Sequence, residues 1–426
     1  MTRVARTLSL AARRAPEPAA PPFLPYGRQT IEDDDVAAVA AVLRSDWLTC
    51  GPVVERFEAT FAEAVGAAEA VVCSSGTAAL HLAGLALDFA PGDAVIVPAI
   101  TFAATANAQR FCGAEVVFAD VDPATGLMTA DHLALAVARA IDGGWRPKAV
   151  VPVHLNGQVC DMPEIASLAA ELRLGVVEDA CHAIGAEYRA ADGRPLRVGA
   201  CSHAAMTVFS LHPVKTATMG EGGVVTTNDS KTAARLRRLR THGIARDPGA
   251  FVNPERAFDA DGQPNPWYSE LQELGFNYRA SDIHCALGLS QLAKIDRFVS
   301  ARRDLMDWYH SRLPGLAPLV EPVGRAPGCS PAWHLAVAMV DFAAAGLSRG
   351  HLMRRLAACG IGTQVHYLPL HWQPYYQKRY GAQHLPGAEA YYARCLSLPL
   401  FPAMSPGDVD RVVDALAGCL TQGGLS

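Results

Sequence analysis

Short apolar runs alternate with amphipathic segments through the first half of the chain. The runs have the length and continuous hydrophobicity of buried strands, and several of the segments between them repeat apolar residues at helical spacing. The predicted strands span residues 70–73, 94–97, 115–119, 149–153, 175–178, 204–209 and 223–227. Apolar strands that alternate with helices predict a mostly parallel sheet covered on both faces. We therefore expect an α/β fold.

Helical periodicity also marks segments before and after this region. The further helices that we expect span 30–44 (with Thr30 as N-cap), 53–65, 283–309, 349–359 and 409–417 (ended by Gly418). A strand is expected near 333–340. The segment after Pro314 therefore reads as a second, smaller α/β domain.

The pattern divides the chain into three parts. Residues 1–22 carry four arginines before any acid and are then rich in Ala and Pro, which predicts a disordered tail and not a signal peptide. Residues 23–295 form the large domain and 296–426 the small one. Within the large domain, residues 246–270 are rich in Pro, Asp and Asn and lack periodicity, so we expect an excursion that serves as a functional loop or a substrate lid.

Polar residues gather where the predicted strands end. They are Ser74 to Thr77, His154, Asp179 and Ser210 to Lys215. Ligands of open α/β sheets bind beyond the carboxyl ends of the strands. The sequence therefore predicts a site at this edge of the sheet.

Composition narrows the class of protein. The 426 residues are 50% hydrophobic and 19% charged, as in a soluble enzyme, and a net charge of -5 argues against nucleic acid as a partner. No apolar run has the length of a membrane span. The eleven cysteines include no C-x-x-C pair, which indicates reduced thiols in a cytoplasmic protein without a metal site.

Lys215 is one of only five lysines among 37 basic residues. It follows a predicted strand and shares a turn with Ser210 and His212. Position alone favours a surface lysine. A lysine in a dry pocket can, however, lose its proton and attack a carbonyl group, which arginine cannot do.

Three other features point to the same chemistry. The turn at 75–78 is either a simple helix cap or an anion site, Asp179 is either a helix cap or a partner for a protonated nitrogen, and Phe102 is either core or a flat cover for a ring. Pyridoxal phosphate needs an amine, an anion cradle, a carboxylate and a flat side chain. Taken with Lys215, these features indicate that cofactor.

Four segments in this order, at 75–80, 98–107, 178–182 and 209–215, resemble the signature segments of the DegT-type nucleotide-sugar aminotransferases. Residues 222–223, 275–279 and 286–292 extend the resemblance, which covers nearly everything from Tyr26 to the C-terminus. It implies the fold of the type I pyridoxal-phosphate aminotransferases and a homodimer.

The resemblance also implies roles for single residues. Lys215 is expected to form the Schiff base with the cofactor and to move a proton, and Asp179 to pair with the pyridine nitrogen. Other contacts to the cofactor are expected from Gly76, Thr77 and Ser210 (phosphate), Phe102 (ring), His182 (ring oxygen or substrate) and, in the neighbouring subunit, Asn277 (phosphate). Each active site is therefore expected to be shared between two chains.

Residues 26–29, 46–49, 266–268 and 365–376 are most similar to the branch of the family that acts in pseudaminic acid synthesis. This implies amination of the C4 ketone of a UDP-4-keto-6-deoxy-N-acetylhexosamine, with glutamate as amine donor. The turn at 362–364 departs from the family pattern. This departure bears on the identity of the substrate and not on the type of reaction. Substrate contacts are expected from Tyr26, Thr49, Arg279, His366, Tyr367 and His371. The aromatic and histidine cluster at 366–376 suits stacking on a sugar or uracil, or equally a packed domain interface.

Three other functions are considered from the sequence, and each requires a feature that differs from this chain. A sugar dehydratase of the same fold would carry histidine in place of Lys215. A non-catalytic relative would lack Lys215 or Asp179. A nicotinamide-dependent enzyme would carry a glycine fingerprint that is missing here.

Overall fold

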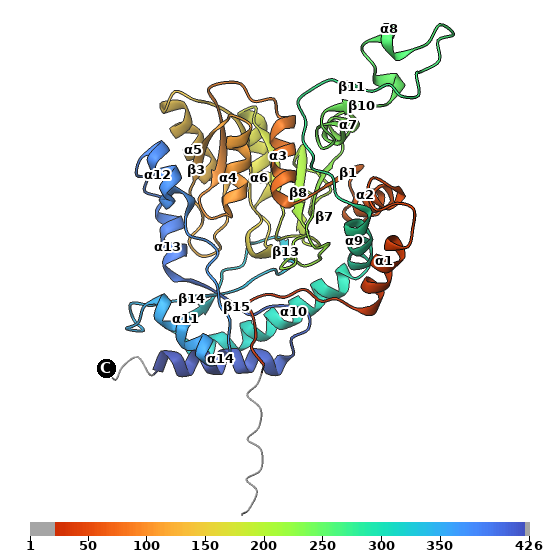
Figure 1. Cartoon of the computed structure of the whole chain (residues 1–426). Helices are drawn as coiled ribbons and strands as arrows, with labels where there is room; N and C mark the ends of the chain where they lie inside the picture. Colours follow the sequence, from red (N-terminus) through yellow and green to blue (C-terminus); the bar gives the residue numbers. More distant parts are fainter. Residues whose placement is uncertain (1–21, 422–426) are drawn as a thin grey trace, which may run out of the picture.

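The computed structural model describes residues 22–421, so the predicted tail lies, apart from Pro22, outside the described residues. A seven-stranded sheet forms the centre of the large domain (Figure 1), in the order β1-β9-β8-β5-β4-β2-β3. Its strands are β1 (Glu69–Cys73), β2 (Asp93–Pro98), β3 (Glu115–Ala119), β4 (Arg146–Val150), β5 (Gly175–Asp179), β8 (Met206–Ser210) and β9 (Gly223–Thr227).

The sheet is mostly parallel, as predicted. The pairs β2–β3, β2–β4, β4–β5 and β5–β8 are parallel, and only β9 runs against its two neighbours. Every residue of β2 and of β9 is buried, which requires cover on both faces of the sheet. The cover includes α3 (Gly76–Ala86), α4 (Ala103–Phe111), α5 (Ala130–Asp142), α6 (Met162–Glu171) and α7 (Ser230–Leu239).

Two strands differ from the prediction at their ends. β4 begins at Arg146 and stops at Val150, and the predicted end at 153 survives only as an isolated bridge from Val153 to Asp179. β8 begins at Met206, two residues later than expected. Apolar residues continue after the end of β4 and precede the beginning of β8 without taking part in the strand, so hydrophobicity alone misplaces these ends.

The predicted helix at 283–309 is wrong as a single helix. The structure has α9 (Asp282–Leu292) and α10 (Ile295–Arg312). Lys294 lies at the break, and its ammonium group pairs with Asp34 at 2.7 Å and Asp35 at 2.9 Å on α1 (Asp33–Leu43). The helix is therefore interrupted where Lys294 contacts a segment far away in the sequence. The local pattern of apolar residues gives no sign of such a contact.

Two other helix ends also differ. α1 is capped by a box between Glu32 and Asp35, not by Thr30. α14 (Pro406–Thr421) continues through Gly418, so this glycine does not end the helix. α2 (Pro52–Val65), in contrast, agrees with the prediction to within one residue.

The small domain is built on a three-stranded antiparallel sheet. Its order is β12-β14-β15, from β12 (Val320–Pro322), β14 (Ala336–Val340) and β15 (Cys395–Leu398). Helix α10 packs on α14, and α11 (Arg349–Ala358) packs on α14 as well. Helices α12 (Pro374–Tyr380) and α13 (Pro386–Arg394) lie between α11 and β15 in the chain.

The first described residues cross to the small domain. The backbone N–H of Leu24 donates to the carbonyl of Gly360 (2.9 Å), and that of Gly362 donates back to Leu24 (2.7 Å). The N–H of Leu400 donates to Tyr26 at 3.0 Å. The start of the large domain is thus held by residues from the other end of the chain.

Residues 246–270 form an arm that projects from the body beside α7 (Figure 1). It contains the short helix α8 (Pro254–Ala257) and lies between the two-residue strands β10 (Ile244–Ala245) and β11 (Glu270–Leu271). Two of its large apolar side chains are exposed, Val252 at 77% and Trp267 at 76%. The rest of the described chain includes a small sheet in which β6 (Glu187–Arg189) pairs with β7 (Pro195–Arg197) on one side and with β13 (Cys329–Ser330) on the other.

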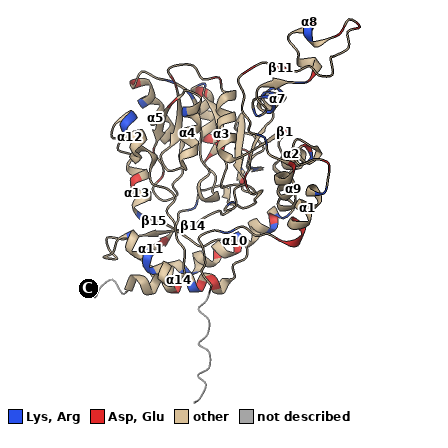
Figure 2. Ribbon diagram, in the orientation of Figure 1, with Lys and Arg blue, Asp and Glu red and all other residues tan. Residues whose placement is uncertain are grey.

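Charged residues of both signs are interspersed over the ribbon in the view of Figure 2. Within residues 22–421 no helix combines the length and the apolar character that a membrane crossing requires. All eleven cysteines are free thiols, and the described residues hold no group of His, Cys, Asp and Glu side chains suited to a metal ion.

Candidate active site

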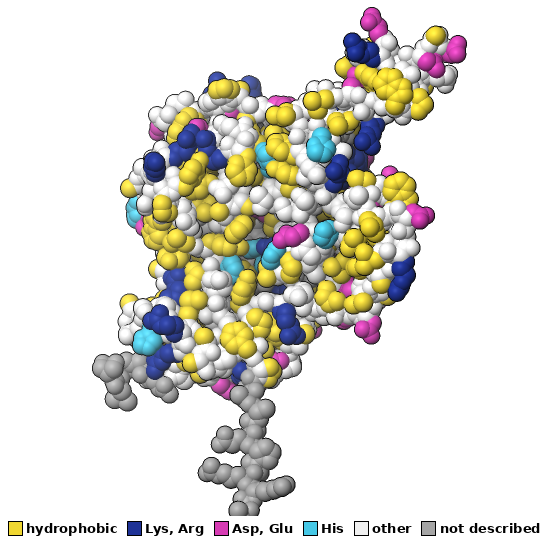
Figure 3. Space-filling model, in the orientation of Figure 1, with side chains coloured by type: hydrophobic (Ala, Val, Ile, Leu, Met, Phe, Trp, Pro, Cys, Tyr) yellow, Lys and Arg dark blue, Asp and Glu magenta, His cyan; other side chains and the backbone are white. Residues whose placement is uncertain are grey.

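A cavity of about 770 Å³ opens between the two domains. Figure 3 shows histidine side chains gathered around the hollow at the centre of this face. The residues that line it come from the ends of β5 and β8, the starts of α3 and α4, and the segment after α11. They include ten of the predicted site residues: Tyr26, Gly76, Thr77, Phe102, Asp179, His182, Ser210, Lys215, His366 and Tyr367.

An anion cradle forms where α3 begins. Ser75 caps this helix, and its hydroxyl accepts the N–H of Ala78 at 3.1 Å. Gly76 lies so close to β8 that an added Cβ would stand 2.8 Å from Cβ of Ser210. The start of α3, with its partial positive charge, and the Ser210 hydroxyl therefore border the same space.

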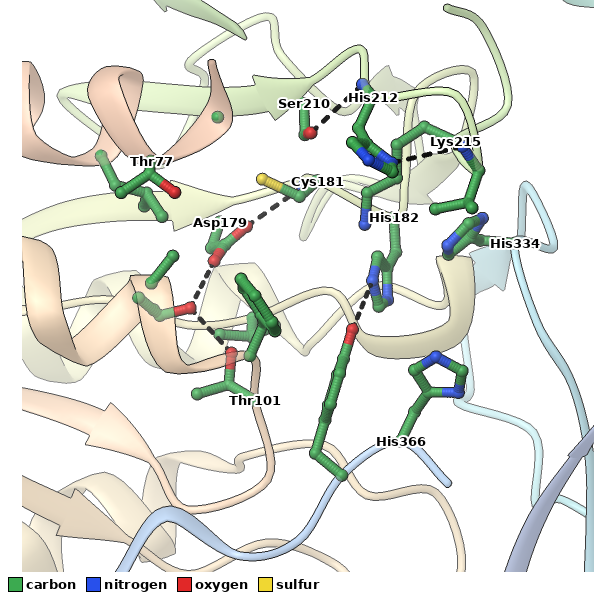
Figure 4. Close-up of a pocket in the computed structure, with 18 of the residues that line it drawn as sticks. Thr77, Thr101, Asp179, Cys181, His182, Ser210, His212, Lys215, His334 and His366 are labelled. Atoms are coloured by element: carbon green, nitrogen blue, oxygen red, sulfur yellow. Dashed lines mark hydrogen bonds between the residues drawn. The ribbon is translucent and has the colours of Figure 1, made fainter. Parts of the chain in front are cut away.

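Asp179 ends β5 and is 4% exposed. Its carboxylate accepts a hydrogen bond from the Thr105 hydroxyl (2.7 Å) and one from the N–H of Cys181 (3.1 Å). Thr105 in turn is 2.8 Å from the Thr101 hydroxyl (Figure 4). These bonds hold the carboxylate at one orientation in the cavity.

Lys215 follows β8 in a turn closed by its own N–H, which donates to the carbonyl of His212 at 2.8 Å. Burial lowers the pKa of the Lys215 ammonium, and the nearby Cys181 and Asp179 oppose this only in part. A lysine that loses its proton more readily is a better nucleophile. His212, by contrast, is exposed, and its Nε2 is 3.9 Å from Glu221.

Aromatic and imidazole rings form the other side of the cavity. The Tyr367 hydroxyl is 3.1 Å from Nε2 of His182, and the ring centres of His182 and His334 are 4.4 Å apart. His366 bonds Ser397 (2.8 Å) through Nδ1 and lies beside Tyr26, at 5.4 Å between ring centres. Burial, with the positive charge of Lys215, lowers the pKa of His182 well below its ordinary value and that of His366 to about 3.

Phe102 precedes α4 and is 59% exposed. Its ring centre is 6.0 Å from that of Tyr367. An exposed phenyl group on a cavity wall is available for stacking and does not contribute to the core as the alternative supposed.

Four predicted residues lie outside the cavity of their own chain. Thr49 is exposed and bridges Ser281, Asn277 is exposed and bridges Thr241, and Arg279 is half-buried. His371 is fully buried, with Nε2 3.5 Å from Glu389. The structure does not bring His371 to the cavity, and the expected roles of the other three stay predictions. No residue of the 246–270 arm lines the cavity either, so it is no lid over this chain's own site as it stands.

Sequence reasoning missed two polar residues that matter here. Thr105 orients Asp179, and its spacing of four from Thr101 on a helix start was the available signal. His334 lines the cavity and is 4% exposed, but it stands at the edge of a predicted strand among apolar residues. Such a position is indistinguishable from the core by pattern alone.

The residues present fit pyridoxal phosphate. The close contact between Gly76 and Ser210 leaves a cradle without side-chain bulk, Lys215 is a half-buried amine that lines the cavity, and the carboxylate of Asp179 is held by hydrogen bonds. In addition, Nδ1 of His182 is buried without a hydrogen-bond partner among the described residues. An unpaired buried polar atom beside such a donor set is what a polar ligand would satisfy.

Comparison with known proteins gives one family. Residues 29–417 match the model of the DegT/DnrJ/EryC1/StrS aminotransferase family. The chain is 39% identical over 401 residues to the spore coat polysaccharide biosynthesis protein SpsC of Bacillus subtilis (strain 168), covering 92% of this chain and 96% of that protein. It is 38% identical over 405 residues to the UDP-4-amino-4-deoxy-L-arabinose–oxoglutarate aminotransferase of Shewanella sediminis (strain HAW-EB3), covering 93% and 97%.

Among solved structures, the chain is similar to Helicobacter pylori PseC, an aminotransferase involved in the biosynthesis of pseudoaminic acid. The TM-score is 0.83 at 27% sequence identity, and the match covers 94% of this chain and 100% of that one. The predicted fold class is thereby confirmed.

Proposed function

We propose, for a chain that belongs to the DegT/DnrJ/EryC1/StrS aminotransferase family, that it transfers an amino group to the C4 ketone of a UDP-4-keto-6-deoxy-N-acetylhexosamine. The proposed cofactor is pyridoxal phosphate, and the proposed amine donor is glutamate. The product would be a 4-amino-4,6-dideoxy sugar of the pseudaminic acid pathway. That the chain is a sugar aminotransferase follows from the family itself; the substrate, donor and pathway are the proposal.

The observation that carries the proposal is the meeting of three groups in one cavity. The anion cradle at Gly76 and Ser210, the carboxylate of Asp179 and the amine of Lys215 come from different elements and border the same space. Gly76, Thr77 and Ser210 would hold the cofactor's phosphate, Asp179 its ring nitrogen and Phe102 its ring face. A dehydratase or a non-catalytic relative is disfavoured because Lys215 and Asp179 are both present.

Bound in this cavity, pyridoxal phosphate supplies an aldehyde that carries the amino group and a ring that withdraws electrons. The protein's own groups supply the rest. Lys215, whose pKa is lowered by burial, can take a proton from the carbon that loses hydrogen and return one to the neighbouring carbon. The Asp179 carboxylate, whose orientation is held by Thr105, would keep the ring nitrogen of the bound cofactor protonated.

The substrate part of the proposal rests on similarity. The Shewanella relative is named for a UDP-linked 4-amino sugar and for oxoglutarate, which is the keto acid that glutamate leaves after giving up its amine. PseC is described as acting in pseudoaminic acid biosynthesis. Both support a C4 amino group on a nucleotide sugar, and the first supports UDP and glutamate.

A second candidate is amination of a UDP-4-keto pentose. It is favoured by sequence identity, because the relative named for an aminoarabinose is 38% identical, whereas PseC is 27% identical. The two candidates share the cofactor, the donor and the reacting carbon. They differ at two positions of the sugar: the hexosamine carries a methyl group on C5 and an N-acetylamino group on C2, where the pentose has hydrogen and a hydroxyl group.

The test is incubation of the purified holoenzyme with glutamate and a panel of nucleotide 4-keto sugars. The panel contains the 6-deoxy-N-acetylhexosamine and the pentose, each on UDP and on another nucleotide. We expect an amino sugar from the UDP-hexosamine, identified by mass spectrometry and NMR. Preference for the pentose would select the second candidate, and no amino sugar from any member would overturn the substrate class.

We also propose a cytoplasmic homodimer in which Asn277 completes the site of the neighbouring chain. The placement of Asn277, exposed and away from its own cavity, is compatible with this role. Arg279 is close to it in sequence and is proposed to reach the same neighbouring site.

A further inference from the structure

On the side of the cavity away from Thr77 and Ser210, Figure 4 shows three imidazole rings. They belong to His182, His334 and His366, which we call the imidazole wall. The three side chains are buried, at 6%, 4% and 7% exposure, and all three line the cavity. They come from the turn after β5, the edge of β14 and the segment after α11, so the fold and not the local sequence brings them together.

The wall has unpaired hydrogen-bonding capacity. Nδ1 of His182 and Nδ1 of His334 are both buried without a partner among the described residues. When the Tyr367 hydroxyl donates to Nε2 of His182, the proton of that ring lies on Nδ1, which is then an unsatisfied donor. Buried polar atoms of this kind are rare in folded proteins unless a ligand or water pairs with them.

The wall also lies near two basic groups. Lys215 lowers the pKa of all three imidazoles, after the larger effect of burial. Behind the wall, the Arg302 guanidinium is 1% exposed and donates to the carbonyls of Leu400 (2.9 Å) and His334 (3.3 Å). Within residues 22–421 no carboxylate pairs with Arg302, and burial lowers its pKa to about 10.

The carboxylates that line the cavity are Asp179 and Glu221, and no arginine of residues 22–421 lines it. Asp179 acts on Lys215, where it opposes the lowering of the pKa, and its carboxylate accepts hydrogen bonds from Thr105 and the N–H of Cys181. Glu221 is 3.9 Å from Nε2 of His212, which is not part of the wall. The wall itself therefore offers ring N–H donors in front of a buried guanidinium that no described carboxylate pairs, and this arrangement favours an anion.

We propose that the imidazole wall binds a carboxylate of the amine donor, with ring N–H groups of His334 and His182 as hydrogen-bond donors. This rests on the proposed function, because it assigns a place to the amino acid of that reaction. Arg302, which bonds the backbone of His334, adds positive potential from behind. The phosphates of the nucleotide are the other anions that the wall could bind. In this proposal they bind outside the wall.

The test measures binding of two probes to the holoenzyme. Glutarate, a dicarboxylate without an amine, reports the donor subsite, and UDP reports the nucleotide subsite, both by titration calorimetry. We expect His334→Ala and His334→Gln to weaken glutarate binding about tenfold or more, as for loss of a hydrogen bond to a charged group. UDP affinity should stay within about twofold of wild type, because no nucleotide contact is removed.

The matched control is His310→Gln. This histidine is half-buried on α10 beside Trp333, has two unpaired ring nitrogens and does not line the cavity. It should leave glutarate affinity unchanged. Thermal unfolding of each variant checks the fold, and His334→Gln retains a polar side chain of similar length if the alanine variant fails to fold.

A second readout separates this inference from the proposed function. Rapid mixing of holoenzyme with L-glutamate follows conversion of the cofactor by absorbance, and its concentration dependence should shift with the glutarate affinity of each variant. Wild type that binds glutarate but is not converted by glutamate would overturn the proposed donor and leave the wall intact. Unchanged glutarate binding in both His334 variants, or a loss of UDP binding instead, would overturn the proposal that the imidazole wall binds the donor carboxylate. Loss of glutarate binding in Arg279→Ala with no loss in the His334 variants would assign the carboxylate to a partner chain and overturn it as well.

Discussion

Asp179 owes its orientation to two hydroxyl groups at the start of α4. Thr105 donates to the carboxylate at 2.7 Å, and Thr101 is 2.8 Å from Thr105. Both threonines are buried, at 1% exposure or less. The orientation of the carboxylate therefore depends on Thr105, a residue that lines the cavity but has no part of its own in the proposed chemistry.

We expect Thr105→Val to weaken cofactor affinity about tenfold or more, because it removes a buried hydrogen bond to a charged group while keeping the side-chain shape. Titration of the apoprotein with pyridoxal phosphate, followed by absorbance, measures this. Thr101→Val is the matched control, and its effect should be smaller because it removes only the outer bond. An equal or larger effect of Thr101→Val would contradict the relay.

At this scale the sequence located the cavity residues at strand ends better than the residues that support them. Asp179 and Ser210 end strands and Lys215 follows one, so a rule about strand ends finds all three, and the structure places them in one cavity. Thr105 and His334 were missed because their roles depend on what lies across a space, and neither spacing nor polarity encodes that distance. Thr49 and His371 were selected by motif, and the structure places both outside the cavity.

Among the elements, α12 packs on the edge of the large sheet, and one carboxylate joins several of the contacts between them. Glu115 begins β3 and pairs with Arg379 at 2.5 Å and with Arg110 at 2.7 Å, and it accepts the Tyr380 hydroxyl at 2.8 Å. Burial alone would raise the pKa of Glu115, but hydrogen bonds from Arg379 and Tyr380 outweigh it and lower the pKa to about 2. The ionised form is thus preferred in the folded protein.

Glu115→Gln should reduce the free energy of unfolding by about 1–2 kcal/mol at pH 7. Because the folded pKa is below the ordinary value of 4.5, this contribution is complete above pH 4.5 and is lost as pH falls toward 2. Urea unfolding of both proteins between pH 7 and pH 3.5 should show the difference shrink below pH 4.5. Glu321→Gln, which removes a more exposed pair with Arg394, should cost about 0.5 kcal/mol or less. A difference that stays constant across this range would contradict the assignment.

Strand and helix types were largely predictable, and their ends were not. The apolar runs of β1, β2 and β3 are short and uninterrupted, as expected of buried strands. The break between α9 and α10 coincides with Lys294 reaching α1, and Gly418 stays helical because it is followed by residues that still pack in α14. Tertiary contact overrode local preference in both cases.

At the scale of the whole molecule, the proposal is that each active site is shared between two chains. It places Lys215 and Asn277 of one site on different chains. Dimers that combine one chain lacking Lys215 with one chain lacking Asn277 test this arrangement.

Lys215→Ala and Asn277→Ala should each inactivate or strongly impair the homodimer. After denaturation and refolding as a mixture, about a quarter of wild-type activity should return, because half of the dimers are mixed and each carries one intact site. Mixing without subunit exchange is the control and should return none. No recovery from a well-refolded mixture would contradict shared sites.

The first described residues pair with segments that are synthesised last. Leu24 is bonded to Gly360 and Gly362, Tyr26 to Leu400, and the Tyr26 ring lies beside His366 on the cavity wall. On the ribosome the N-terminal segment must therefore wait for most of the chain, including β15, before its partners emerge. A nascent chain ending before β14 would present Lys215 on a completed strand but in an open cavity. We therefore expect the proposed cofactor to reach its final environment only after the C-terminal strand has left the ribosome.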